Sequence, residues 1–193
     1  MTCEPHKAPF TNAFPLATLV LVDMKRSSLA SAMGLGRADI AGILSNCRSA
    51  LAYARKIGWP VAFVCGSGDT AADRVNEWIK GFEPQRSDAL FYRHSGSCYS
   101  SPYFEQGMQE AGSSVVFAGF LGRGGCLSTG ADAFLVGQRV TFLSDATLDE
   151  ATSYALGESA ARLLRAFTTF DIDIVTTGAW IRTIERAPIA INN

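Results

Sequence analysis

The chain has 193 residues, of which 48% are hydrophobic and 18% charged, and its formal net charge is -1. This is the length of one ordinary domain, so we expect a single domain over residues 1–193 with its core at about 16–180. Acidic and basic residues are interspersed, and the absence of a basic stripe excludes nucleic acid as an expected partner. The low charge leaves apolar surface for a partner subunit, so we expect a homodimer or homotetramer.

The amino-terminal stretch MTCEPHKAPFTNAFP lacks the charged segment and apolar run of a secretory signal, and no apolar run is long enough to cross a bilayer. We therefore expect a cytoplasmic protein with no membrane partner. The cysteines form an odd set without CxxC spacing and the two histidines lack metal-ligand spacing: Cys3, Cys47, Cys65, Cys98 and Cys126, with His6 and His94. Reduced thiols are expected, with no metal and no other cofactor.

Six apolar, β-rich runs recur along the chain with helical stretches between them, which is typical of a parallel sheet with crossover helices. Strands are predicted over Ala17–Val22, Pro60–Cys65, Ala89–Tyr92, Ser114–Ala118, Arg139–Leu143 and Ile172–Thr176. Helices are predicted over Ala38–Ile57, Tyr103–Ala111, Cys126–Val136 and Thr152–Phe167. Most strand runs are continuously apolar, so helices should cover both faces of the sheet. The expected fold class is α/β, a Rossmann-like three-layer αβα sandwich, with an irregular loop over 66–87 beside the site.

Reactive side chains follow several of the predicted strands. In open parallel sheets, ligands bind outside the carboxyl ends of the strands, where the strand order reverses. Asp23 follows the first strand, Arg93 and His94 the third, and Cys126 the fourth. Successive residues at a strand end point to opposite sides, so His94 should face away if Arg93 faces the site. A carboxylate, a guanidinium and a thiol are thus expected in one site.

Cys126 lies in GFLGRGGCLSTGADAF, where a strand ends, glycines cluster and an apolar helix begins. The N-terminus of a helix favours thiolate over thiol, and its N–H groups can hold a developing oxyanion. Structural alternatives exist for both residues: Cys126 as a small side chain packing a helix end, and Asp23 as a carboxylate satisfying nearby backbone N–H groups. The Gly-rich strand-to-helix turn favours the functional interpretation.

The segments LVDMK, GWPVAFV, DALFYRHSGSCYSSPYF and VVFAGFLGRGGCLSTGADAFLVGQRVTFLSDA occur in this order. Together they resemble the isochorismatase-like cysteine hydrolase superfamily over roughly residues 16–180. The resemblance implies a six-stranded parallel sheet and an Asp-Lys-Cys triad, with Asp23 as base and Cys126 as nucleophile. It implies an oxyanion hole at the backbone of Gly122 and Cys126, beside a Leu121–Gly122 peptide that is often cis in the family. The implied substrate-binding positions are Lys25, Trp78, Tyr99, Phe120 and Leu121.

Three departures from the family pattern affect this comparison. Arg93 stands at the lysine position; it always carries charge and cannot deliver a proton, although it can hold Asp23 and stabilise negative charge. Lys25 stands where a glutamine is common. The His-bearing metal motif of nicotinamidases is missing after the second strand, where the chain reads CGSGD. The spacing from Gly119 to Cys126 and the ADAF that follows resemble the isochorismatase branch instead.

Three functions are open. The first is hydrolysis of a small amide or other C–N bond through a thioester on Cys126, with Asp23 as base. The second is isochorismatase-type hydrolysis of a vinyl ether, in which Asp23 protonates the substrate and Cys126 is dispensable. Both take a small-molecule substrate. The third is a non-catalytic ligand-binding or interaction protein, because Arg93 replaces the family lysine and a fold does not fix function. Cys65 and Cys98 are expected to be buried, inert thiols.

Overall fold

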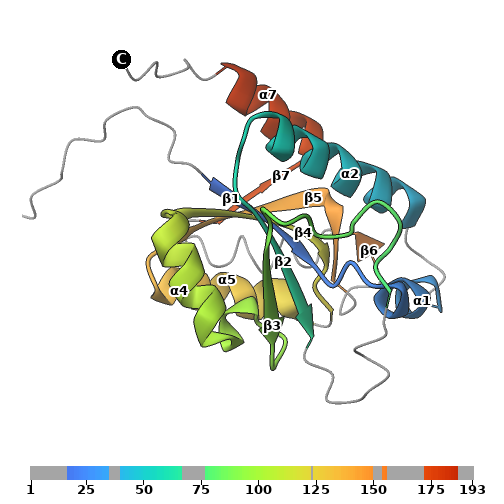
Figure 1. Ribbon diagram of the computed structural model, residues 1–193, viewed down its shortest axis with the longest axis horizontal. Helices are drawn as coiled ribbons and strands as arrows, with labels where there is room; N and C mark the ends of the chain where they lie inside the picture. Colours follow the sequence, from blue (N-terminus) through green and yellow to red (C-terminus); the bar gives the residue numbers. More distant parts are fainter. Residues whose placement is uncertain are drawn as a thin grey trace, which may run out of the picture.

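The computed structural model describes residues 17–34, 40–66, 77–122, 124–149, 154–155 and 172–186. A sheet lies at its centre, with the strands in the order β3-β2-β1-β4-β5 and with β6 and β7 both paired to β5 (Figure 1). Every pairing is parallel except that of β6. The strands are β1 (Ala17–Val22), β2 (Val61–Gly66), β3 (Ala89–Arg93), β4 (Ser114–Phe120), β5 (Arg139–Asp149), β6 (Tyr154–Ala155) and β7 (Ile172–Val175). The predicted α/β class with six parallel strands is confirmed.

Helices cover both faces of this sheet. The helical segments are α1 (Arg26–Gly34), α2 (Ile40–Lys56), η1 (Cys98–Ser100), α4 (Pro102–Ala111), α5 (Gly125–Leu135) and α7 (Thr177–Arg186). In Figure 1, α2 and α7 lie on one face and α4 and α5 on the other. The central strand β1 is buried throughout, with Leu19 and Leu21 in the core cluster beneath α2 and with Val20 and Val22 in the cluster beneath α4 and α5. The three-layer arrangement is therefore confirmed.

The structure differs from the predicted elements in several places. β5 continues to Asp149, six residues past its predicted end at Leu143, because its second half pairs with β4 beyond an irregularity and then with β6. Residues Tyr154–Ala155 were predicted to be helical and instead form β6, since the extended end of β5 offers them a partner strand. The rest of the predicted helix over 152–167, and residues 67–76 of the predicted loop, lie outside the described residues. The helices α1 and α7 were not predicted.

The strand order reverses between β1 and β4, and the backbones there approach each other closely. Gly119 of β4 has a φ of +105°, and a Cβ at this position would lie 2.3 Å from the carbonyl oxygen of Val22. Only glycine fits such a contact and such a φ. The glycine thus allows the carboxyl ends of β1 and β4 to lie side by side.

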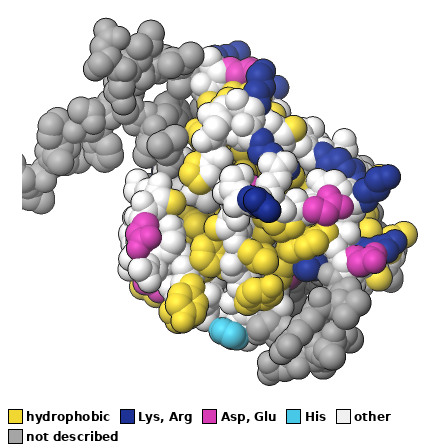
Figure 2. Space-filling model, in the orientation of Figure 1, with side chains coloured by type: hydrophobic (Ala, Val, Ile, Leu, Met, Phe, Trp, Pro, Cys, Tyr) yellow, Lys and Arg dark blue, Asp and Glu magenta, His cyan; other side chains and the backbone are white. Residues whose placement is uncertain are grey.

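The outer strand β3 carries exposed hydrophobic side chains, Leu90 and Tyr92, and Tyr103 is exposed on the neighbouring helix α4. Figure 2 shows hydrophobic side chains gathered on the face of the molecule that presents these elements. Such surface is available to a partner subunit, and the homo-oligomer stays a prediction. None of the helices within the described ranges is long and apolar enough to span a membrane.

Candidate active site

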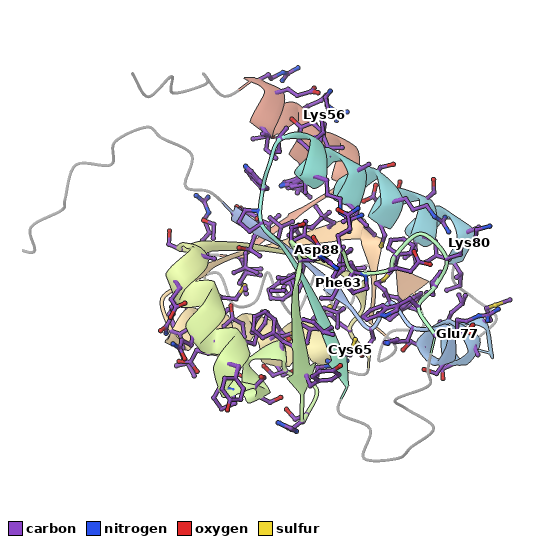
Figure 3. All side chains as sticks on the ribbon, in the orientation of Figure 1. Lys56, Phe63, Cys65, Glu77, Lys80 and Asp88 are labelled. Carbon is purple, nitrogen blue, oxygen red and sulfur yellow. The ribbon has the colours of Figure 1, made fainter. Side chains whose placement is uncertain are left out.

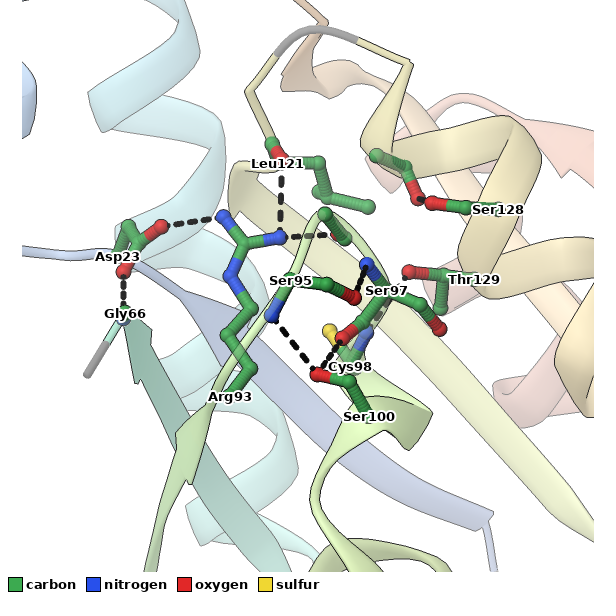
Figure 4. Close-up of polar contacts among 12 residues, drawn as sticks. Asp23, Gly66, Arg93, Ser95, Ser97, Cys98, Ser100, Leu121, Ser128 and Thr129 are labelled. Carbon is green, nitrogen blue, oxygen red and sulfur yellow. Dashed lines mark hydrogen bonds and ion pairs between the residues drawn. The ribbon is translucent and has the colours of Figure 1, made fainter.

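The carboxyl ends of four strands carry the site. Asp23 follows β1, Gly66 ends β2, Arg93 ends β3, and the turn after β4 leads into α5 with Cys126 as its second residue. Parallel strands end at the same edge of a sheet, and the crevice at a reversal of strand order opens there. Figure 4 shows the resulting polar contacts, with Asp23 and Arg93 pointing toward each other.

Asp23 is placed by an unusual backbone conformation. Its φ is 49°, and among the described residues it is the one non-glycine residue with a positive φ. Aspartate tolerates this left-handed region better than most residues. The turn aims the side chain across the strand ends, where Oδ1 accepts a hydrogen bond from the backbone N–H of Gly66 at 2.7 Å. Oδ2 lies 2.5 Å from Nη2 of Arg93. A strained residue that holds a carboxylate in this way is typical of a functional position.

Arg93 connects three segments through one planar group. Its side chain is only 7% exposed. Nη2 donates to Asp23, while Nη1 donates to the carbonyl oxygen of Leu121 at 3.0 Å and to that of Gly96. The fixed fork of a guanidinium can serve acceptors that lie in several directions in its plane. Arg93 therefore links the Asp23 carboxylate, after β1, with the turn that precedes Cys126.

The turn between β4 and α5 is built from glycines. Gly122 and Gly124 have φ values of +75° and +70°, and the N–H of Gly125 donates to the carbonyl of Gly122 at 3.2 Å. A Cβ on Gly125 would lie 3.2 Å from the carbonyl oxygen of Gly96 and 3.6 Å from Nη1 of Arg93. The chain thus passes directly over the guanidinium before it reaches Cys126, which is buried at the start of α5.

The peptide between Leu121 and Gly122 is trans, because no cis peptide bond occurs among the described residues. The cis bond that the family often has at this position is therefore not present here. A cis peptide before a residue other than proline costs about 3 kcal/mol. Here the positive φ of Gly122 turns the chain with trans peptides, and the Leu121 carbonyl is directed at Arg93.

Two of the expected substrate-binding residues meet beside this edge of the sheet. The Lys25 ammonium lies 3.6 Å from the centre of the Trp78 ring, and the two backbones form an isolated antiparallel bridge. The ring of Trp78 also packs edge-on against Phe63. This cation–π pair ties Trp78, in the predicted loop over 66–87, to Lys25, which lies two residues after Asp23.

The other three expected contacts are core residues. Phe120 and Leu121 are buried in the core clusters on opposite faces of the sheet. The Tyr99 ring packs edge-on against Phe104, and its hydroxyl donates to Oε1 of Gln138, next to the first residue of β5. Tyr99 therefore points to the amino ends of the strands, whereas Cys126 lies at their carboxyl ends. This geometry argues against the substrate contact expected for Tyr99.

The remaining candidates make no hydrogen bond to Asp23 or Arg93 among the described contacts. His94 is exposed while Arg93 is buried, in keeping with the alternation expected at a strand end. Burial raises the pKa of Cys65 and of Cys98 to about 12, and for Cys65 the negative charge of Asp23 adds to this effect. Figure 3 places Cys65 near the end of β2. Both groups stay protonated thiols at neutral pH, as their expected inert role requires.

Several groups at the site come from the backbone and carry no side-chain signal. They are the N–H of Gly66 and the carbonyls of Gly96 and Leu121. The run HSGSCYSS after β3 was the one available sign that a tight, hydrogen-bonded turn lies there. Within the described residues, no group of three His, Cys, Asp or Glu side chains is arranged to hold a metal ion.

Residues 17–169 match the family model for the isochorismatase domain. The chain belongs to the isochorismatase family. Its fold is similar to that of an isochorismatase from Pseudomonas putida KT2440, with 19% identity, a TM-score of 0.66, and 86% of this chain and 90% of that chain covered. A cysteine hydrolase from Pseudomonas syringae pv. phaseolicola 1448A is also similar in fold, with 19% identity and a TM-score of 0.68. The match covers 92% of this chain and 96% of that chain.

A third similar structure is the N-carbamoylsarcosine amidase from Thermoplasma acidophilum, with 17% identity, a TM-score of 0.62, and coverage of 83% of this chain and 96% of that chain. At these identities the likeness concerns the fold. No match was found among proteins with curated functions. The family, and the α/β architecture that the sequence resemblance implied, are thus confirmed for this isochorismatase-family chain.

Proposed function

We propose that this isochorismatase-family protein hydrolyses a C–N bond, such as that of a small amide, through a thioester on Cys126. One observation carries the proposal: Arg93 binds both the Asp23 carboxylate and the Leu121 carbonyl, which begins the turn to Cys126. A base, a cation and a thiol at a helix N-terminus thus come from three strand ends to one edge. That set suits nucleophilic catalysis.

The reaction begins when Asp23 accepts the thiol proton of Cys126. The sulfur then attacks the substrate carbonyl carbon, and the carbonyl oxygen becomes an oxyanion. Backbone N–H groups at Gly122 and Cys126, at the positive end of α5, are the proposed donors to this oxyanion. The C–N bond breaks, the leaving nitrogen takes the proton from Asp23, and a thioester remains on the sulfur.

Water completes the cycle. Asp23 accepts a proton from a water molecule whose oxygen attacks the thioester carbon, the C–S bond breaks, and the proton returns to the sulfur. Arg93 cannot take part in proton transfer because its guanidinium keeps its charge. In this proposal Asp23 therefore moves every proton, and Arg93 orients it. Two proteins of similar fold, a cysteine hydrolase and an N-carbamoylsarcosine amidase, support the reaction class.

A panel of small amides, carbamoyl compounds and isochorismate tests this function, with mass spectrometry to detect an acyl adduct on Cys126. Cys126→Ala and Asp23→Asn should each remove nearly all turnover, because nucleophile and base act as a unit. Asparagine suits the left-handed backbone at position 23, so the fold should persist. Cys98→Ala and Asp173→Asn serve as matched controls and should keep activity.

Two outcomes would contradict the thioester mechanism. Turnover of isochorismate that survives in Cys126→Ala and is lost in Asp23→Asn would establish vinyl-ether hydrolysis, in which the carboxyl group protonates a carbon. An active protein that never forms the adduct, with normal turnover in Cys126→Ala, would remove the nucleophile assignment.

A further inference from the structure

One hydroxyl group holds the turn that follows β3. Ser100 Oγ accepts a hydrogen bond from the backbone N–H of Ser95 at 3.1 Å and donates to the carbonyl of Ser97 at 2.8 Å (Figure 4). It also accepts a hydrogen bond from the backbone N–H of His94 at 3.0 Å. A serine hydroxyl has one donor and two acceptor positions. All three are used, so the hydroxyl ties both sides of the turn together.

The turn presents the carbonyl of Gly96 to the site. This oxygen accepts a hydrogen bond from Nη1 of Arg93 and lies 3.2 Å from where a Cβ on Gly125 would be. A second anchor joins the same turn to α5, because the N–H of Cys98 donates to Oγ1 of Thr129 at 3.2 Å. The Gly96 carbonyl is therefore fixed between the end of β3 and the first turn of α5.

The position of this carbonyl determines the orientation of Arg93. Nη1 has two hydrogens, and they go to the carbonyls of Gly96 and Leu121. Because the guanidinium is planar, these two bonds fix the direction of Nη2, which meets Asp23. Without the Gly96 carbonyl, the guanidinium keeps its bonds to Leu121 and Asp23 but loses one of its three acceptors, so its plane, and with it the position of the Asp23 carboxylate, is held less firmly.

We propose that Ser100 is a positioning residue for the reaction. It touches neither the nucleophile nor the base; it fixes the Gly96 carbonyl, which orients Arg93, which in turn orients Asp23. The assignment rests on the proposed function, in which Asp23 carries every proton. A base that is misplaced by about 1 Å can lose about a hundredfold in rate, so the effect should appear in kcat.

The test compares Ser100→Ala and Ser100→Thr with Ser49→Ala. The control removes a hydroxyl that bonds to the Ser45 carbonyl on the exposed side of α2. Ser100→Ala should lower kcat by about tenfold to a hundredfold, with KM changed less than about threefold. Threonine keeps the hydroxyl and should restore kcat to within about threefold, and Ser49→Ala should match the wild type. Thermal unfolding shows which variants are folded.

A second readout does not depend on turnover. The Gly66 amide donates to Asp23 Oδ1, and Ser100 contacts neither group. Hydrogen exchange of this amide should therefore become faster in Ser100→Ala and stay unchanged in Ser49→Ala. A folded Ser100→Ala protein with kcat within about twofold of wild type and unchanged Gly66 exchange would overturn the proposal. If the wild type turns over no compound in the panel, the proposed function fails and Gly66 exchange alone decides the positioning role.

Discussion

Asp23 Oδ2 lies 2.5 Å from Arg93 Nη2, although the two residues come from strands that are not neighbours. Asp23 directly follows β1, Arg93 is the last residue of β3, and β2 lies between these strands in the sheet. The left-handed backbone at Asp23 and the length of the arginine side chain span the intervening strand. Both side chains are largely buried, with 16% and 7% exposed. Removal of either partner would therefore leave the charge of the other one largely buried and unpaired, which destabilises a folded protein.

Replacing Arg93 tests this effect on stability. Arg93→Met leaves a buried carboxylate and two carbonyls without their donor and should destabilise the protein by about 3 kcal/mol. Arg93→Lys should destabilise the protein less, because its ammonium can still pair with Asp23, although it cannot reach all three acceptors of the guanidinium. Urea denaturation measures both. Arg139→Met breaks an exposed pair with Asp173 and should change stability little. A methionine variant as stable as the wild type would refute the structural role.

The thiols should differ in reactivity. Burial raises the pKa of Cys47, Cys65 and Cys98 to about 12, so only about one in ten thousand of each is thiolate at pH 8. Cys126 is buried as well, but it lies at the amino end of α5, where the helix favours the anion. Iodoacetamide labelling with peptide mapping should therefore show Cys126 modified before these three. Preferential labelling of Cys65 or Cys98 would count against the nucleophile.

The same three thiols predict a loss of stability at high pH. Their pKa in the folded protein lies above the ordinary thiol value of 9.0, so the unfolded chain releases these protons first. Their contribution is complete below pH 9 and falls as the pH rises toward 12, by up to about 1.4 kcal/mol per pH unit for each thiol. Cys47→Ser keeps a hydrogen-bond donor for the Ala146 carbonyl. It should reduce the pH dependence of the unfolding free energy by the contribution of one thiol. Equal slopes for variant and wild type between pH 9 and 11 would contradict this.

Gly119 should tolerate no side chain. In Gly119→Ala the new methyl would meet the Val22 carbonyl at 2.3 Å, so the carboxyl ends of β1 and β4 must separate and the variant should fail to fold or unfold at far lower temperature. Gly58→Ala is the matched control, because its φ is +71° and nothing lies within 4 Å. It should cost about 1 kcal/mol from the backbone alone. Similar melting temperatures for the two variants would show that the contact between the strands is unimportant.

Tyr99→Phe distinguishes a core residue from a pocket residue. It removes the donor to Gln138, which is buried, and should cost about 1–2 kcal/mol. KM and kcat should be unchanged, since the hydroxyl lies at the opposite end of the strands from Cys126. A rise in KM without loss of stability would instead show that the Tyr99 hydroxyl contacts the substrate.

The strands were predictable because buried parallel strands are continuous apolar runs, and β1 begins and ends at its predicted residues. The helices α1 and α7 were missed because they are short and depend on packing, through Ala32 and Trp180, more than on local sequence. β6 could not be predicted, since its two residues are strand only through pairing with β5.

The site, too, could be predicted from the sequence only in part. Asp23, Arg93 and Cys126 could be selected because each follows or ends a predicted strand and carries a reactive group. The contacts that hold them could not, because Gly66, Gly96 and Leu121 act through backbone atoms whose directions depend on the completed fold.

The central place of β1 affects how the chain is made. Val22 leaves the ribosome early, but β4, which pairs along its other edge, is complete only at Phe120. At about 5–20 residues per second, that interval lasts on the order of 5–20 s. During this time one edge of β1, a strand that is buried throughout in the folded protein, has no neighbour, and such an unpaired edge favours aggregation and chaperone binding. Soluble yield should therefore depend more on chaperone supply and growth temperature than on the stability of the finished protein.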